Sequence, residues 1–143
     1  MIKILFSITL LLFICVNSIA QVAVIAHKSA PVDEISRSQV LDFYTRDVRT
    51  WENGQAVIVF DLKPKSAVKN SFYNFIGKTS SRMKSIWMKN LLSGEGDPPK
   101  AFVSEQEMLE NVANTPGAIG FISEDMAGSE VKVVAIIELV KDD

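Results

Sequence analysis

The sequence predicts an α/β domain, in which a sheet and helices pack in layers. Apolar, β-branched runs of strand length alternate along the chain with segments of helical periodicity. Most of these runs are apolar throughout rather than alternating with polar residues, which is typical of a sheet covered on both faces. With 143 residues, the chain has the length of one compact domain.

The first twenty residues have the layout of a secretory signal peptide. A positive start at Lys3 precedes an almost continuously apolar stretch over residues 4–16, and small side chains (Ser18 and Ala20) occupy the −3 and −1 positions of a cleavage site. The apolar stretch is shorter than the ~20 residues that a membrane-spanning helix needs. We therefore expect an exported, periplasmic protein.

Cleavage after residues 1–20 leaves one domain over residues 21–143, which begins at Gln21 and has no cysteine. Cys15 lies inside the apolar stretch, and the bulky pair before it does not match a lipoprotein processing site. Loss of one lysine leaves 14 basic and 17 acidic residues, a net charge of −3. This composition excludes disulfides and argues against a nucleic-acid partner.

The first predicted strand covers residues 22–26, a short β-branched run. Ser36 and Gln39 fit a capping box, in which each side chain accepts from the other residue's backbone N–H, so a helix is expected to begin there. The turn-forming residues 52–54 then lead into a second strand over residues 56–60.

Two helices are expected after the second strand. Pro64 ends that strand, the hydroxyl of Ser66 can cap the next helix, and Gly77 stops it. Another helix begins near Ser80, and its expected buried face carries Met83, Ile86, Trp87 and Leu91.

One more helix and two more strands are predicted in the last third of the mature chain. Ser104 and Glu107 fit a second capping box, and the helix that they open ends at residues 115–117. Strands follow over residues 118–122 and 131–139, and the latter is apolar almost throughout.

The sequence offers no catalytic set, which favours a binding protein over an enzyme. The single histidine, His27, is expected at a strand end, and no short-spaced cluster of ligands predicts a metal site. No glycine-rich phosphate loop is present, so we expect no cofactor. Trp51 and Trp87 can stack on a ligand, although the spacing of Trp87 favours the core.

One segment, residues 61–69, has the features of an anion site. It joins a strand end to a helix N-terminus, where unpaired N–H groups attract anions, and it carries three lysines. Lys63, Lys65 and the Ser66 hydroxyl are the expected donors. The alternative is a helix cap surrounded by solvated lysines.

Several motifs resemble those of phosphate ABC-transporter substrate-binding proteins, the PstS-like branch of the periplasmic binding proteins. Residues 115–122 (TPGAIGFI) are similar to that family's "tPGAIGYv" signature. Residues 38–44 with 51–54 resemble its "ql..IF.G…W.dG" stretch, and residues 93–99 resemble its "sG.g.pP" loop. Order and spacing agree over residues 22–137.

This resemblance implies a single periplasmic-binding-protein-like lobe with a mostly parallel sheet and helices on both faces. The family's two-lobed members bind phosphate between the lobes, and their second-lobe motif resembles Arg-x-x-Gly-Ser-Gly-Thr. Counting back from Phe72 places that arginine at Leu62 and retains Ser66. The same count places the motif's next glycine and its threonine at Ala67 and Val68. With the donors expected from the helix terminus, the predicted ligand site consists of Lys63, Lys65, Ser66, Ala67 and Val68.

Two functions remain open at this stage. The first is weak binding of phosphate or a similar small oxyanion. The second is a lobe that serves protein interaction or sensing without high-affinity phosphate binding. Its partner is then a periplasmic or membrane protein or a second copy of the chain.

Overall fold

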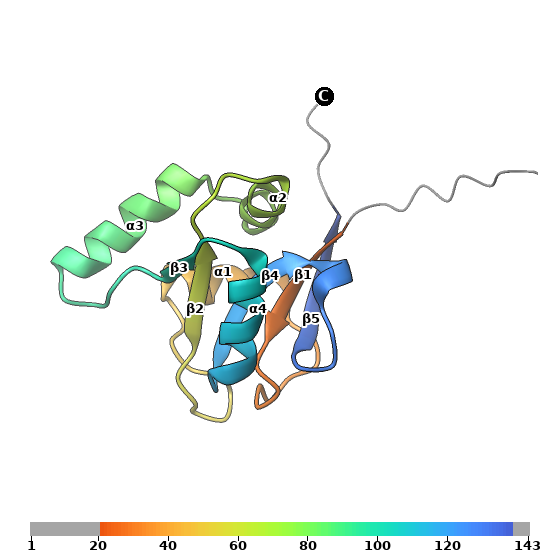
Figure 1. Ribbon diagram of the computed structural model, residues 1–143. Coiled ribbons are helices and arrows are strands. Elements are labelled where there is room, and N and C mark those ends of the chain that lie inside the picture. The colour runs from red at the N-terminus through yellow and green to blue at the C-terminus, as the bar shows by residue number, and fades with distance from the viewer. Residues whose placement is uncertain (1–20, 139–143) are drawn as a thin grey trace, which may run out of the picture.

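The computed structural model describes residues 21–138 (Figure 1). The predicted signal peptide and Leu139, the predicted end of the last strand, lie outside these residues. Within them the chain forms β1 (Gln21–Ala26), α1 (Arg37–Thr45), β2 (Ile58–Leu62), α2 (Ala67–Ile76), α3 (Ser80–Leu92), β3 (Lys100–Phe102), α4 (Glu105–Asn114), β4 (Ala118–Ser123), the short 3-10 helix η1 (Glu124–Met126) and β5 (Lys132–Glu138).

The described strands form one sheet in the order β3-β2-β4-β1-β5. β2 pairs in parallel with both β3 and β4, whereas β1 pairs antiparallel with both β4 and β5. Of the five described strands, four therefore share one direction. The prediction of a mostly parallel sheet is confirmed.

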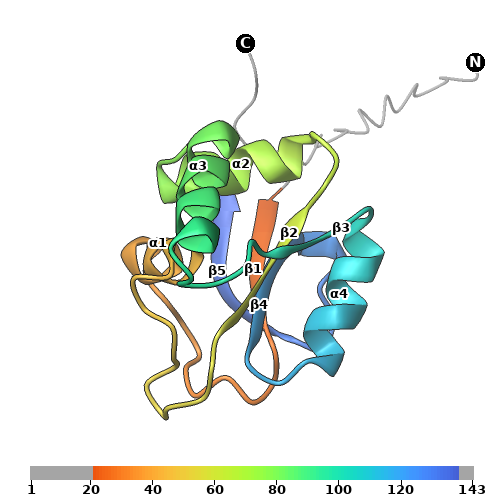
Figure 2. The same ribbon diagram turned by 90° about the vertical axis from the view of Figure 1, so that its left-hand side faces the viewer.

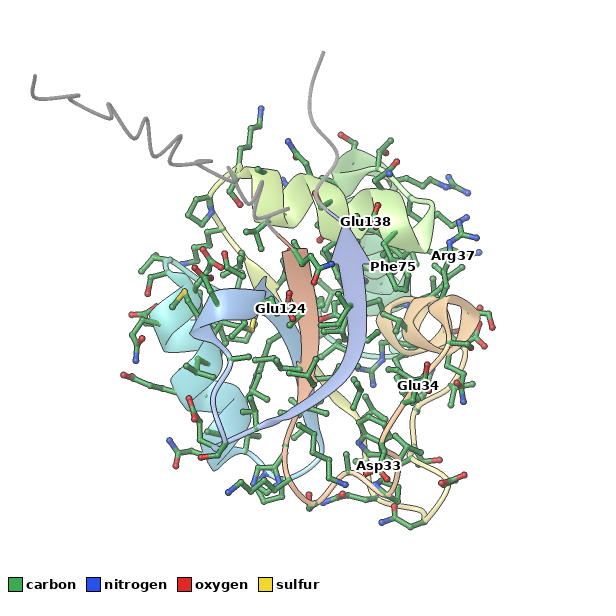
Figure 3. The ribbon with its side chains drawn as sticks, turned by 90° about the vertical axis from the view of Figure 1, so that its right-hand side faces the viewer. Asp33, Glu34, Arg37, Phe75, Glu124 and Glu138 are labelled. Atoms are coloured by element: carbon green, nitrogen blue, oxygen red, sulfur yellow. The ribbon has the colours of Figure 1, made fainter. Side chains whose placement is uncertain are left out.

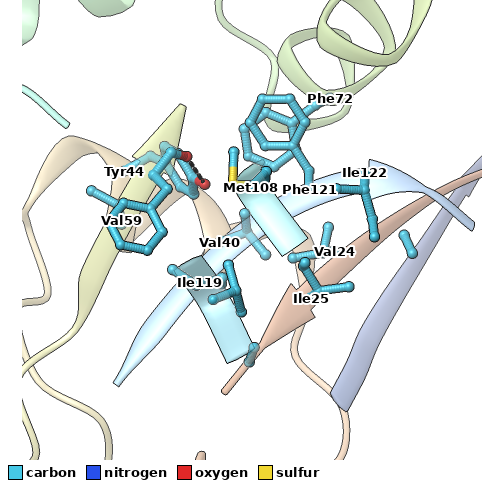
Figure 4. Packing of buried hydrophobic residues seen from close by; sticks show 14 of the residues in the cluster. Val24, Ile25, Val40, Tyr44, Val59, Phe72, Met108, Ile119, Phe121 and Ile122 are labelled. Atoms are coloured by element: carbon cyan, nitrogen blue, oxygen red, sulfur yellow. Dashed lines mark hydrogen bonds between the residues drawn. The ribbon is translucent and has the colours of Figure 1, made fainter. Parts of the chain in front are cut away.

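Helices cover both faces of this sheet, as predicted (Figure 2). Successive residues of β4 show it: the ring of Phe121 stacks on Phe72 of α2 with centroids 4.0 Å apart, while Gly120 faces Met108 of α4. Tyr44 of α1 packs on the same Phe72 at 4.8 Å. The core thus has one layer under α1 and α2 and another under α4 (Figure 4).

Serine caps begin α1, α2 and α4 at the predicted positions, whereas Thr79 caps α3. At α1 the capping box is complete, because Gln39 Oε1 accepts the Ser36 N–H at 2.8 Å and Ser36 Oγ accepts the Gln39 N–H. At α4 only half of the predicted box forms. Ser104 Oγ accepts from the Glu107 N–H, but the Glu107 carboxylate accepts from Val103 rather than from Ser104.

The second strand lies two residues later than predicted, over Ile58–Leu62 rather than 56–60. Ala56 instead bridges Thr50. The strand extends beyond Phe60 because its end pairs with β3, a three-residue strand that the sequence did not predict. Asp61 and Leu62 are consequently strand residues, not loop residues.

The last strand was predicted to be buried on both faces, but one of its faces is exposed. β5 lies at the edge of the sheet, and Val133 and Ile136 are 39% and 44% exposed. The reason is the position of α4, which packs mainly over β4 and leaves this face of β5 open.

The predicted turn before β4 is confirmed, and it has a structural role. Gly117 adopts a left-handed conformation (φ 82°) as the chain enters the buried strand. Its carbonyl accepts from the indole of Trp51 at 3.0 Å and from the N–H of Ile58 at 3.0 Å.

Among the described helices, none has the length and apolar character required to cross a bilayer.

Candidate functional site

The predicted anion site lies at the carboxyl edge of the parallel strands, where β2 leads into α2. The loop of residues 63–66 is held to the neighbouring strand, because the Lys63 N–H donates to the carbonyl of Phe102 at 2.8 Å. Ser66 is the N-cap, and its Oγ accepts from the Lys69 N–H at 3.1 Å. Its hydroxyl hydrogen is available to a ligand.

The first turn of α2 presents backbone donors beside positive side chains. Ala67 and Val68 occupy the first two helical positions, where N–H groups have no acceptor within the helix. Lys63 and Lys65 are exposed next to them. The Val68 side chain is buried, so this residue can contribute only its N–H.

The helix α4 begins at the same edge of the sheet, but its own acidic side chains lie beside its positive N-terminal end. Two glutamates lie in its first turn. Glu105 Oε1 accepts from the N–H and the Oγ of Ser123 at 2.5 and 2.7 Å, and Glu107 accepts from the Val103 N–H at 3.2 Å. None of the residues Ala67–Ile76 in α2 is acidic. An added anion is therefore favoured at α2 over α4.

A buried lysine that the sequence analysis did not assign lies beneath this turn. Lys69 is 6% exposed, and its Nζ donates to the Leu62 carbonyl at 2.5 Å and lies 3.7 Å from Asp61 Oδ2. The ammonium also lies 5.6 Å from the ring centroid of Tyr73. The only available signal is its place in the first turn, because helical side chains lean towards the N-terminus.

The electrostatics beneath the site depend on Asp61. Burial raises the pKa of the Asp61 carboxyl, and the nearby Lys69 charge opposes that rise without cancelling it. Burial and the Asp61 charge raise the pKa of Tyr73. Neither Asp61 Oδ1 nor the Tyr73 hydroxyl makes a hydrogen bond of good geometry to a described residue.

The position that corresponds to the arginine of the PstS-like motif is occupied by Leu62, whose side chain lies in the hydrophobic core. Leu62 is 3% exposed and contributes its side chain to the core, while its carbonyl is bound by Lys69. The site thus brings together Ser66, the two first-turn N–H groups and two exposed lysines, without a bidentate cation.

The other residues considered for chemistry are structural. His27 directly follows β1, at the strand end where it was predicted, and its ring Nδ1 accepts from the Ser29 N–H at 3.0 Å. Trp51 and Trp87 are 2% and 5% exposed, and the Trp87 indole donates to the Tyr44 carbonyl at 2.8 Å. Within residues 21–138, no cluster of three or more histidine, cysteine or acidic side chains is arranged to hold a metal ion.

The fold is similar to that of solved phosphate-transport receptors. A Clostridium perfringens structure with bound phosphate, assigned to the phosphate ABC transporter substrate-binding proteins, superposes with a TM-score of 0.66 at 20% identity. It covers 81% of this chain and 45% of its own. An ABC-type phosphate transport receptor from Vibrio cholerae superposes with a TM-score of 0.64 at 20% identity, over 80% of this chain and 45% of the receptor. PstS from Borrelia burgdorferi superposes with a TM-score of 0.59 at 14% identity, over 81% of this chain and 47% of PstS.

No protein-family model matches the sequence, and no curated protein matches it significantly. The likeness is therefore one of fold: the chain has the architecture of a PstS-like, periplasmic-binding-protein lobe. It spans a little under half the length of the solved proteins that it resembles.

Proposed function

We propose that this chain is an exported, periplasmic lobe that binds a small oxyanion of the phosphate type at the N-terminus of α2. The proposed ligand residues are Lys63, Lys65, Ser66, Ala67 and Val68. The observation that carries the proposal is the contrast between the two helices at this edge: α4 places its own carboxylates at its first turn, whereas α2 places none and is flanked by exposed lysines. The activity is binding rather than catalysis.

Each group has a defined role in the proposed complex. The N–H groups of Ala67 and Val68 and the hydroxyl of Ser66 donate to the ligand oxygens, and the helix dipole adds to their attraction. Lys63 and Lys65 contribute charge from outside the loop. Water screens these contacts, so each lysine is worth roughly 1 kcal/mol or less.

We expect weak affinity, on the order of 0.1–1 mM, because one open lobe leaves much of the ligand in water. Titration of the mature protein with phosphate and with sulfate at low salt, followed by amide chemical shifts, tests the proposal. The expected result is saturable shifts centred on the amides of Ala67 and Val68, which weaken as chloride is added.

Variants make this test specific. Ser66→Ala combined with Lys65→Ala should abolish the shifts. Lys28→Ala is the matched control, since Lys28 is an exposed lysine that follows β1 at the opposite edge of the sheet. If phosphate causes no shift at several millimolar, or if the control variant loses binding equally, the oxyanion proposal fails.

A second candidate function is protein interaction, and the surface of α3 supports it. Met88 and Leu92 are 50% and 81% exposed. Exposed apolar side chains that gather on one helix are typical of a contact surface. Under this proposal the partner is a periplasmic or membrane protein or a second copy of the chain.

A further inference from the structure

We propose that this protein associates with copies of itself head to tail, with α3 of one copy docked on the open face of β5 of the next. The α3 face is the set Lys84, Met88, Lys89, Leu91 and Leu92. The β5 face is the set Glu124, Val133, Ile136 and Glu138. Neither set overlaps the proposed oxyanion site, so this inference stands independently of it.

The α3 face is apolar at its centre and positive around it. Met83, Trp87 and Asn90 attach the helix to the body on its other side. Leu91, expected on that buried side, is 41% exposed, beside Met88 at 50% and Leu92 at 81%. The helix also carries Arg82, Lys84 and Lys89, and none of the residues Ser80–Leu92 is acidic.

The β5 face is apolar because of an irregularity in the strand. A register shift between Val24 and Ile25 places Val133 opposite Ile25 and Ile136 opposite Ala23. These partners continue to Gly120 and Ile122 of β4, on the side of the sheet where α4 packs. Val133 and Ile136 therefore share one face although they lie three residues apart.

Two acidic residues border the β5 face. Glu138 closes the described end of the strand and Glu124 lies on the α4 side, whereas Asp33 and Glu34 lie on the opposite side of the sheet (Figure 3). Lys132 is the cation of this strand, and its ammonium is already engaged by the Ala30 carbonyl at 2.8 Å and by Asp33 at 3.4 Å.

Charge complementarity selects a second copy as the occupant. The two faces lie at opposite ends of the molecule (Figure 1), and each has an apolar centre. The charges around the α3 face are positive, whereas those around the β5 face are negative. Pairing of α3 with α3, or of β5 with β5, would bring like charges together. Strand-to-strand pairing at β5 is also obstructed, because the Val134 carbonyl already accepts from the Ile35 N–H at 3.0 Å.

A head-to-tail contact does not close after two copies, so assemblies should lengthen with concentration. Sedimentation velocity of the mature protein from micromolar to millimolar concentration measures this. We expect the weight-average mass to rise with concentration and to fall when salt is added, because the charges are screened.

Two variants provide the decisive mixing experiment. Met88→Ser with Leu92→Ser removes the α3 face, and Val133→Thr with Ile136→Thr removes the apolar centre of the β5 face. All four positions are exposed, so circular dichroism should show both variants folded. Each variant alone should be monomeric, whereas an equimolar mixture should form a dimer and nothing larger, since each copy retains one working face.

Other outcomes overturn the proposal. A β5-face variant that still self-associates indicates pairing of α3 with α3. A mature protein that stays monomeric at millimolar concentration and low salt excludes self-association. Vesicles of phosphatidylglycerol that bind such a monomer through Leu92 would identify α3 as a lipid surface instead.

Discussion

The ammonium of Lys69 lies 3.7 Å from the Asp61 carboxylate, and both side chains are only 7% exposed. The same ammonium donates to the carbonyl of Leu62. This pair joins the first turn of α2 to the end of β2, directly beneath the proposed anion site. The position of that turn therefore depends on a buried ion pair, whose removal has a predictable cost.

Lys69→Met should destabilise the protein by about 3 kcal/mol at a pH of about 8, because it leaves the Asp61 carboxylate buried without a cation. Lys69→Met combined with Asp61→Asn should lose less, since no charge then remains buried. Urea unfolding of the single and double variants measures both effects. Equal losses in the two variants would show that packing, not charge, is what Lys69 supplies.

Asp61 should also make stability depend on pH in a defined direction. Its pKa is raised in the folded state, so the folded protein holds this proton more tightly than the unfolded chain does. The contribution of Asp61 to stability therefore falls as pH rises from about 4, its ordinary unfolded value, through the raised folded value. The free energy of unfolding of the wild type minus that of Asp61→Asn should decrease over this range; a constant difference would contradict the prediction.

Gly120 should be required for packing rather than for ligand binding. A Cβ there would lie closer than 3.0 Å to Met108 Sδ and 3.2 Å from Val112 Cγ2, both in the buried face of α4. Gly120→Val should therefore cost about 1–3 kcal/mol in thermal or urea unfolding. Met108→Ala should recover part of the loss by making room. Loss of phosphate binding without loss of stability would falsify this role.

Local signals in the sequence located the features that depend on local chemistry. Ser36 and Ser66 cap helices where the sequence predicted, because a cap needs only a side-chain oxygen and nearby backbone donors. The turn at Gly117 was predictable for the same reason. These features are fixed within a few residues of the chain.

Features that depend on distant segments were missed or misplaced. β3 exists because three residues pair with β2 across two intervening helices, and no periodicity can show in so short a run. The apolar run of β5 indicated a strand but not which face α4 would leave open. The burial of Lys69 likewise depends on Asp61, which lies across the loop in a different element.

The start of the mature chain is a further prediction, which rests on the sequence. Cleavage after Ala20 would keep all described residues of β1 (Gln21–Ala26) in the mature chain, including Gln21, which pairs with Glu138. N-terminal sequencing or intact mass of the exported protein should therefore identify Gln21 as the first residue. A lipid-modified Cys15 in that position would contradict the cleavage site and replace it with a lipoprotein anchor.

The contrast between α2 and α4 can itself be tested by giving α2 the carboxylate that α4 has. Ala67 occupies the first helical position after its serine cap, as Glu105 does in α4, and it is exposed. A glutamate there should interact favourably with the helix dipole and stabilise the protein by about 0.3–1 kcal/mol. The same charge should compete with an added oxyanion for the first-turn N–H groups. Ala67→Glu is therefore expected to raise the unfolding midpoint while removing the phosphate-induced amide shifts. Ala67→Gln, which has nearly the same size and no charge, should keep most of the binding. If Ala67→Glu binds phosphate as the wild type does, the ligand lies elsewhere on the lobe.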